Sequence, residues 1–363
     1  MNAEPFYRLL PNRVWRTYLG GGTLDAISGV QPPEDGHFPE DWILSTTRAV
    51  NVGREKIDEG ISRVLSSSGE PVSLTELLEC FPEQILGGEH LKKFGKQPGF
   101  LLKYLDSSIR LHLQCHPTIP FARKYLNSNS GKSEGYYILG VRPGCEGYIY
   151  LGFQNPPPPE ELRRMIAEQD LPALFGCMEK ITVRPGDAFH VPGGFPHAIG
   201  EGVFMIEMME PTDLVVRIEF ERGGYRLPES ARFMNRGIDF AVSMFDFKRR
   251  SVETIRRERF VVPKPLPIDG AGERFSLFDR RYTNCFRAEK IIVHREASVR
   301  QSGFRVLVVT RGTGTLLAGN RRCELRQYDR ILIPAATEEV GFRTDRELEV
   351  VAALPPEEAK WQK

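Results

Sequence analysis

The stretch from residue 100 to residue 221 is a series of short apolar runs separated by turn residues, and this pattern restricts the fold most. Typical runs are FLLKYL (100–105), YYILG (136–140) and YIYLG (148–152). Glycine and proline interrupt them, as at RPG (142–144). Apolar runs of about 4–8 residues bounded by such residues indicate β-strands. Because long helical patterns are few, the sequence predicts a mostly-β protein built from barrels or sandwiches.

The order of the strand-like runs also predicts how the chain divides. Further runs of this kind lie at 181–191, 203–209, 214–221 and across 275–354, and a helical stretch at 229–259 separates the last two. A chain of 363 residues exceeds the usual size of one domain, which is roughly 150 residues. We therefore expect a first β-domain at 1–228, a helical connection at 229–262 and a second β-domain at 263–363.

Two segments of the chain repeat one pattern, in which a turn aspartate leads into an apolar run that closes with proline. Three positions match at one constant offset, and the matched pairs are Asp187 with Asp329, Pro192 with Pro334, and His197 with Glu339. A repeat of this kind indicates two copies of one β-barrel unit. The second copy carries a glutamate in place of the histidine.

Composition excludes several classes of protein. The 49 basic and 48 acidic side chains leave a net charge of +1, which gives no overall field for nucleic acid or an anionic membrane. No stretch approaches the roughly 18 apolar residues of a membrane span, and the first residues lack the apolar core of a signal peptide. The six cysteines include no CxxC pair, which favours a reducing compartment. We expect a cytoplasmic protein without a nucleic-acid or membrane partner.

The segment RLHLQCHP (110–117) alternates strictly between polar and apolar residues. In a strand, every second side chain lies on the same face, so His112, Gln114 and His116 should point together. Elsewhere Glu134 precedes a strand-like run and His197 follows one. Imidazole nitrogens with carboxylate and amide oxygens form a mixed ligand set for a divalent first-row metal.

Several segments together resemble the type I phosphomannose isomerases, which are metal-dependent cupins. They are FLLKYLD (100–106), LHLQCHP (111–117), GKSEGYYIL (131–139), RPGDAFHVPGGFPHAIGEG (184–202) and TDLVVR (212–217). The resemblance implies two cupin-type jelly-roll barrels, the second metal-free. It also implies a zinc ion held by Gln114, His116, Glu134 and His197. Arg217 matches the family's active-site arginine, and Lys103 and Lys132 would line the sugar-phosphate pocket.

Such an enzyme moves a proton between C1 and C2 of an open-chain sugar through a cis-enediol. A metal near the two oxygens orients the sugar and stabilises the enediolate, and Arg217 adds a fixed positive charge. The proton-transfer base stays open among His112, Glu207 and a water held by the metal.

Two departures from the family pattern concern the substrate. The family reads Trp-Gly-Gly near its start, whereas here residues 16–19 separate Trp15 from the glycines at 20–22. His112 stands where the family commonly has a small hydroxyl residue associated with phosphate binding. We expect His112 to face the pocket and to bind the phosphate. An imidazole carries positive charge only when it is protonated, and its unperturbed pKa is about 6.5.

The predicted function is interconversion of mannose-6-phosphate and fructose-6-phosphate, an aldose–ketose isomerisation of carbohydrate metabolism. Three alternatives remain: a cupin oxygenase using Fe(II), a non-catalytic sugar-binding or regulatory cupin, and an isomerase of a related sugar. The glutamine in the ligand set disfavours the oxygenase. The expected partner is a small sugar phosphate, and the expected assembly is a monomer or homodimer.

Overall fold

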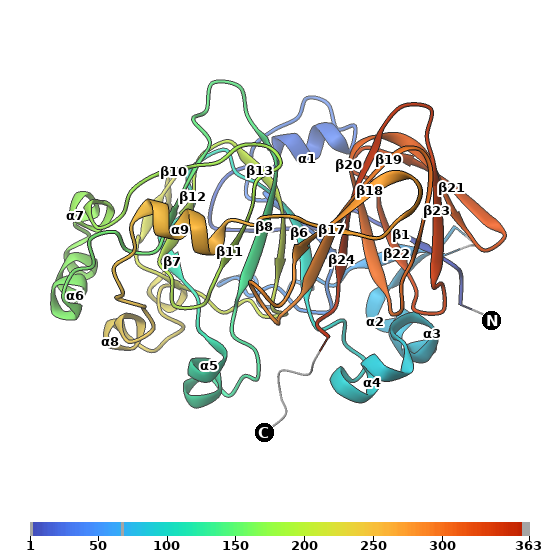
Figure 1. The fold of residues 1–363 in the computed structure, drawn as a ribbon. Coiled ribbons are helices and arrows are strands. Elements are labelled where there is room, and N and C mark those ends of the chain that lie inside the picture. The colour runs from blue at the N-terminus through green and yellow to red at the C-terminus, as the bar shows by residue number, and fades with distance from the viewer. Residues whose placement is uncertain (1–2, 67–68, 358–363) are drawn as a thin grey trace.

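The computed structural model describes residues 3–66 and 69–357. They form two β-barrels that lie side by side, with short helices on the outer surfaces (Figure 1). The barrel that contains β6 to β13 is called the first barrel below, and the barrel that contains β18 to β24 is called the second barrel. The prediction of a mostly-β protein with two jelly-roll barrels is confirmed.

The first barrel consists of two antiparallel sheets that face each other. In order, the six-stranded sheet contains β11 (Ala188–Val191), β8 (Glu134–Val141), β13 (Val203–Met209), β6 (Leu101–Asp106), β3 (Glu40–Leu44) and β2 (Arg13–Val14). The five-stranded sheet contains β10 (Ile181–Thr182), β9 (Tyr148–Leu151), β12 (His197–Ile199), β7 (Gln114–Cys115) and β14 (Val216–Arg217). A small separate ribbon pairs β15 (Glu221–Arg222) with β16 (Tyr225–Arg226).

The second barrel is one eleven-stranded sheet. Its strands from the C-terminal part of the chain are β17 (Lys264–Leu266), β18 (Asp269–Phe278), β19 (Arg287–Arg300), β20 (Arg305–Ala318), β21 (Arg321–Arg326), β22 (Arg330–Ile333), β23 (Glu339–Arg343) and β24 (Leu348–Leu354). The remaining strands are β1 (Tyr7–Leu9), β4 (Arg63–Leu65) and β5 (Pro71–Ser73), and β1 pairs with β22. The start of the chain thus hydrogen-bonds to the second barrel, and the predicted division at 228 and 262 stays a prediction.

The helices of the described residues are short. They are α1 (Gly22–Ile27), α2 (Leu74–Cys80), α3 (Pro82–Leu86), α4 (Gly88–Phe94), α5 (Ile119–Tyr125), α6 (Pro159–Glu168), α7 (Leu171–Gly176), the 3₁₀ turn η1 (Glu229–Ala231), α8 (Ile238–Val242) and α9 (Val252–Arg259). Ser73 caps α2, since its Oγ accepts a hydrogen bond from the backbone N–H of Glu76 at 3.1 Å. None of these helices is long and apolar enough to span a membrane.

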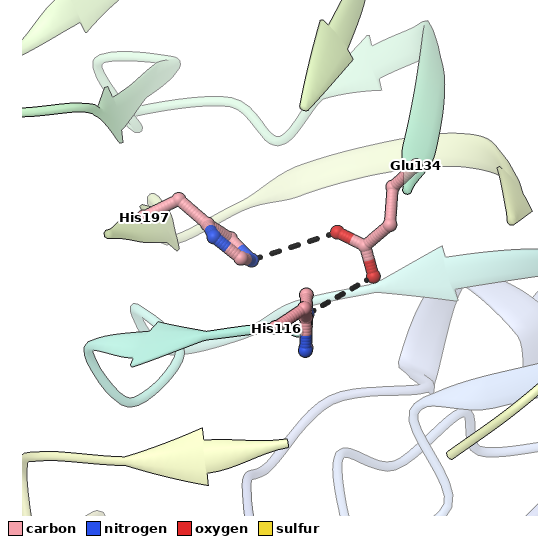
Figure 2. Close-up of side chains that lie close together, drawn as sticks. All are labelled: His116, Glu134 and His197. Carbon is pink, nitrogen blue, oxygen red and sulfur yellow. Dashed lines mark ion pairs between the residues drawn. The ribbon is translucent and has the colours of Figure 1, made fainter. Parts of the chain in front are cut away.

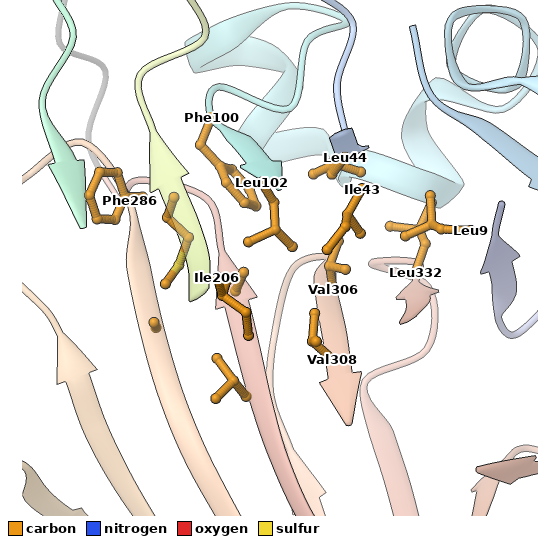
Figure 3. Packing of buried hydrophobic residues seen from close by; sticks show 14 of the residues in the cluster. Leu9, Ile43, Leu44, Phe100, Leu102, Ile206, Phe286, Val306, Val308 and Leu332 are labelled. Atoms are coloured by element: carbon orange, nitrogen blue, oxygen red, sulfur yellow. The ribbon is translucent and has the colours of Figure 1, made fainter. Parts of the chain in front are cut away.

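The six-stranded sheet is buried on both faces, so β13 is apolar at every position except Glu207. Ile206 and Met208 point away from the first barrel and pack with Leu102 against the second barrel. Figure 3 shows Val306 and Val308 of β20 among their partners. On the opposite outer side, α6, α7 and α8 cover the five-stranded sheet. The six-stranded sheet therefore lies between the interior of the first barrel and the second barrel.

The sequence repeat corresponds to a repeated turn. The backbone N–H of Arg184 donates to Asp187 Oδ2 at 2.9 Å, and that of Arg326 donates to Asp329 Oδ2 at 2.9 Å. Each turn leads directly into a strand, β11 in the first barrel and β22 in the second. The third matched position differs: His197 is buried, whereas Glu339 is exposed and forms an ion pair with Arg300.

Candidate active site

Four side chains with metal-ligating atoms come from both sheets of the first barrel. Gln114 lies on β7 and His197 lies opposite it on β12, where the two residues are register partners. His116 follows β7 by one residue, and Glu134 begins β8 in the facing sheet. The strand alternation predicted for 110–117 thus places Gln114 and His116 together, although only Gln114–Cys115 is a regular strand.

The imidazoles of His116 and His197 converge on the carboxylate of Glu134 (Figure 2). His116 Nε2 lies 3.1 Å from Glu134 Oε1, and His197 Nε2 lies 3.5 Å from Glu134 Oε2. The amide of Gln114 is 3.3 Å from His197 Nε2. The ligand atoms of the two histidines and the glutamate all lie within 4.8 Å of one another, close enough to surround one ion.

Backbone carbonyls fix the orientation of both histidines. His116 Nδ1 donates to Leu214 O at 2.9 Å, and His197 Nδ1 donates to Phe195 O at 2.9 Å. The Nε2 lone pair of each ring therefore faces the carboxylate, as in histidines that bind metal ions. Burial lowers the pKa of His116 to about 3 and also lowers the pKa of His197. Both rings are neutral at physiological pH, which is the form that ligates metals.

Glu134 supplies the negative charge of this cluster. Burial acts to raise its pKa, but the positive charge of Lys132 opposes burial, and the pKa lies well below its usual range. Lys132 Nζ lies 2.6 Å from Glu134 Oε1 and 3.0 Å from His116 Nε2. The ligand atoms thus form a site that stabilises a cation. Two imidazole nitrogens, a carboxylate and an amide fit a divalent ion such as Zn²⁺.

Gln114, Lys132 and Glu134 line a cavity inside the first barrel, and His116 and His197 lie beside it in contact with Glu134. Its charged lining consists of four cations and four carboxylates, which are Arg16, Lys103, Lys132 and Arg217, and Glu40, Glu134, Glu207 and Asp213. A second, larger pocket shares Asp213, Val215 and Arg217 with it and lies beside it. When all eight groups are charged, the inner cavity is electrically balanced without a metal.

Comparison with known proteins identifies the family. No family model matches the chain. A mannose-6-phosphate isomerase of Bacillus subtilis is 32% identical over 353 residues, which span 92% of this chain and 94% of that protein. The chain belongs to the mannose-6-phosphate isomerase family. A second member, from Streptococcus mutans, is 27% identical over 357 residues, 97% of this chain and 98% of that protein.

Solved structures of mannose-6-phosphate isomerases share the two-barrel fold. The Bacillus subtilis structure superimposes with a TM-score of 0.74 at 21% identity, covering 96% of this chain and 99% of that one. A structure described as holo and zinc-bound has a TM-score of 0.71 at 18% identity, covering 97% and 100% of the two chains. The predicted resemblance to the type I isomerases is thereby confirmed.

The two lysines predicted for the pocket line it, but both are held in buried ion pairs. Lys103 Nζ lies 3.0 Å from Glu207 Oε2 and 3.2 Å from Glu40 Oε2. Lys132 is held by Glu134, as described above. Each ammonium group therefore already has a carboxylate partner.

His112 also lines the cavity, as its place in the alternation predicts. Its Nδ1 donates to Glu219 O at 3.0 Å, and its Nε2 faces Thr17 O at 3.5 Å. Burial and, second, the charge of Arg217 lower the pKa of His112 to about 4. The imidazole is therefore neutral near pH 7, and the binding of phosphate by His112 stays a prediction.

Arg217 lines both cavities. Within the part of the chain that the structure describes, its side chain makes one hydrogen bond, from Nη1 to Ala231 O at 3.2 Å. Glu219, two residues further along the chain, pairs with Arg110 at 2.6 Å and not with Arg217.

Sequence reasoning missed part of the pocket, namely Arg16, Tyr18, Glu40 and Asp213. One signal for Glu40 was present in the sequence: two acidic residues, Glu40 and Asp41, open the fully buried strand EDWIL. Carboxylates in a buried strand need cationic or hydrogen-bonding partners, so they indicate a polar site.

Proposed function

We propose that this chain is a metal-dependent mannose-6-phosphate isomerase that interconverts mannose-6-phosphate and fructose-6-phosphate through a cis-enediol. Membership in the family supports the substrate and the reaction type. The observation that carries the proposal is the convergence of two buried imidazoles on the buried carboxylate of Glu134, which lines the cavity. The cofactor in this proposal is one divalent ion, zinc, as named for a structurally similar isomerase.

Gln114, His116, Glu134 and His197 are the proposed metal ligands. Gln114 would hold the ion through its amide oxygen once the amide group is turned over, because its oxygen and nitrogen ends are nearly equal in shape. When bound, the ion polarises the sugar oxygens at C1 and C2 and stabilises negative charge there. The backbone hydrogen bonds to the two imidazoles keep the ligands in place before the ion arrives.

Arg217 is the proposed catalytic residue. Its guanidinium stays protonated near neutral pH, and few protein groups compete for its N–H donors. It therefore stabilises the charge that develops on the enediolate oxygens.

Glu207 is the proposed proton-transfer group, in preference to His112. Both nitrogens of His112 face backbone carbonyls, whereas the carboxylate of Glu207 lines the cavity. Burial raises the pKa of Glu207 above its usual range although Lys103 opposes the shift. A carboxyl group with a raised pKa takes and returns a proton more readily near neutral pH.

Lys103, His112 and Lys132 are the proposed substrate-binding residues. Together with Arg16 and Arg217, the two lysines give the cavity four cationic side chains, which favour a substrate that carries negative charge. The lysines then act as hydrogen-bond donors held in place by carboxylates, and His112 acts as a neutral wall of the pocket.

The proposal also covers the location, the assembly and the partners of the protein. We infer a cytoplasmic enzyme that works as a monomer or homodimer without a nucleic-acid or membrane partner. The six free cysteines and the balanced net charge support this setting. The division into 1–228, 229–262 and 263–363, with a metal-free second barrel, belongs to the same proposal.

Metal analysis combined with an isomerase assay tests the function. We expect about one divalent ion per chain and turnover of mannose-6-phosphate that disappears in His116→Ala and His197→Ala. The matched control is Glu339→Ala, which changes the corresponding position of the second barrel and should keep metal and activity. Full metal in both histidine variants would refute the ligand set. Sugar-phosphate binding without turnover would instead favour the regulatory cupin, and turnover of another sugar would change the substrate.

A further inference from the structure

We propose that Arg16 is a positioning residue that holds Asp213 away from Arg217, so that the positive charge of Arg217 stays available to the reacting sugar. Arg16 belongs to the segment 16–19 that separates Trp15 from the following glycines. The inference rests on the proposed isomerase function, and the experiment below separates the failure of one from the failure of the other.

Arg16 is held firmly in the wall of the cavity. The residue is 3% exposed. Its backbone N–H donates to His37 O at 2.8 Å, and its carbonyl accepts from His37 Nδ1 at 2.8 Å. Its guanidinium lies 5.0 Å from the ring centroid of Trp42. The side chain therefore has little freedom to choose other partners.

The guanidinium of Arg16 binds two buried carboxylates at once. Its Nε donates to Glu40 Oε2 at 2.9 Å, while Nη1 and Nη2 donate to the two oxygens of Asp213 at 2.9 and 3.1 Å. The backbone N–H of Val50 adds a third hydrogen bond to Asp213. Such a two-pronged contact is stronger and more directional than a single ion pair. Both oxygens of Asp213 are thus engaged on the side of Arg16.

Arg217 lies four residues after Asp213 and lines the same two cavities. It nevertheless has no ion pair with any carboxylate of the described residues, and its guanidinium donates only to Ala231 O. Burial lowers the pKa of Arg217, and among the neighbouring charges Asp213 opposes this shift most. Asp213 and Arg217 thus already interact electrostatically. The hydrogen bonds from Arg16 to Asp213 keep Asp213 from forming a direct ion pair with Arg217.

Removal of the Arg16 charge would leave a buried carboxylate without its cation. A buried unpaired charge is unstable and seeks a partner, and Arg217 is the pocket arginine without a carboxylate. A pair between Asp213 and Arg217 would cancel the charge that the transition state needs. The loss should therefore appear in kcat, because the affected interaction forms with the enediolate and not with the ground-state sugar.

The test uses the metal-loaded enzyme and the variants Arg16→Gln, Asp213→Asn and the double variant. We expect kcat of Arg16→Gln to fall at least tenfold while KM changes less than threefold and metal content stays constant. In the double variant the carboxylate that captures Arg217 is gone, so kcat should recover most of this loss. Losses that multiply in the double variant, or an unchanged kcat in Arg16→Gln, would overturn the proposal.

Two further variants guard against a merely structural effect. Arg16→Lys keeps a charge without the two-pronged contact and should give an intermediate kcat, which keeps the proposal falsifiable if Arg16→Gln does not fold. Arg142→Gln is the matched control, because Arg142 also bridges two carboxylates, Asp35 and Asp106, and does not line the cavity. It should lower the melting temperature and leave kcat unchanged. An equal fall of kcat in the control would overturn the specific role of Arg16.

A binding measurement tests the role of Arg16 independently of turnover. A hydroxamate of a five-carbon sugar phosphate mimics the planar, anionic enediolate, and calorimetry should show its Kd at least tenfold weaker in Arg16→Gln than in the parent. The Kd of the double variant should again lie close to that of the parent. A parent that binds the hydroxamate but does not isomerise mannose-6-phosphate would refute the proposed function, and the comparison of variants would still decide the role of Arg16.

Discussion

Lys103 is the cation between two buried carboxylates, and its removal gives the sharpest test of the pocket electrostatics. Lys103 on β6 and Glu207 on β13 are register partners on neighbouring strands. The Nζ atom lies 3.0 Å from Glu207 and 3.2 Å from Glu40, and all three side chains are at most 5% exposed. The substitution Lys103→Met keeps the length of the side chain and removes only the charge.

The size of the effect follows from these distances. At an effective dielectric constant of about 20, each contact corresponds to roughly 5 kcal/mol of Coulomb attraction. The desolvation of the ammonium group offsets part of this, and breaking a buried pair from one side typically costs about 3–5 kcal/mol. We expect a loss of that size in the free energy of unfolding of the metal-free protein.

The loss of unfolding free energy in Lys103→Met should depend on pH, because Glu207 can become neutral by taking up a proton when the neighbouring cation is absent. Burial already raises its pKa, and Lys103 is the charge that opposes the shift most. Without the lysine the pKa rises further. A group whose pKa is raised on folding contributes stability at low pH that is lost as pH rises through the folded-state pKa. The deficit of Lys103→Met should therefore be larger at pH 9 than at pH 6.

Urea unfolding of chelator-treated protein at both pH values measures the deficit. The double variant Lys103→Met with Glu207→Gln removes the titrating carboxyl group, so its deficit should be nearly the same at pH 6 and pH 9. A deficit of Lys103→Met that is equal at both pH values, or smaller at pH 9, would refute this account of the Lys103–Glu207 pair.

Three other predictions concern the site and its support. Arg217→Lys should lower kcat far more than it raises KM in steady-state assays, because a compact ammonium replaces the guanidinium fork at the developing charge. KM for mannose-6-phosphate should change with pH in the same way in the parent and in His112→Ser between pH 6.5 and 8.5, since burial keeps His112 neutral there with a pKa of about 4, and the titration of Glu207 affects both proteins alike. Gly135→Ala should lower the melting temperature and weaken metal binding measured by competition with a chelator, because a Cβ there would meet Phe286 at 2.7 Å and displace the strand that carries Glu134.

One part of the metal cluster was predictable from a local pattern, whereas Glu134 and His197 were added to it from the resemblance to the family. Alternation over residues 110–117 placed Gln114 and His116 on one face, and the structure brings them beside His197. The turn aspartates of the repeat were also predictable, since each acts within three residues of its partner. Period-two patterns report which side chains share a face, and turn residues report where strands end.

The Arg16 cluster was not predictable, because its contacts are long-range. Arg16 binds Glu40 across 24 residues and Asp213 across 197 residues, and no periodic pattern joins such positions. The pairing of β1 with β22 is of the same kind, since Tyr7 is the register partner of Leu332. Local patterns define strands, whereas the choice of partner strand depends on packing between distant segments.

The second barrel supports the active site although it lies outside the cavity. On β13, Glu207 faces the pocket while its neighbours Ile206 and Met208 pack against the second barrel. On β8, Glu134 faces the metal cluster while Gly135 touches Phe286 of the second barrel. Adjacent residues of a strand point to opposite faces, so a shift of the second barrel displaces the strands that carry both carboxylates. The barrel that does not contain the metal cluster therefore fixes the geometry of the one that does.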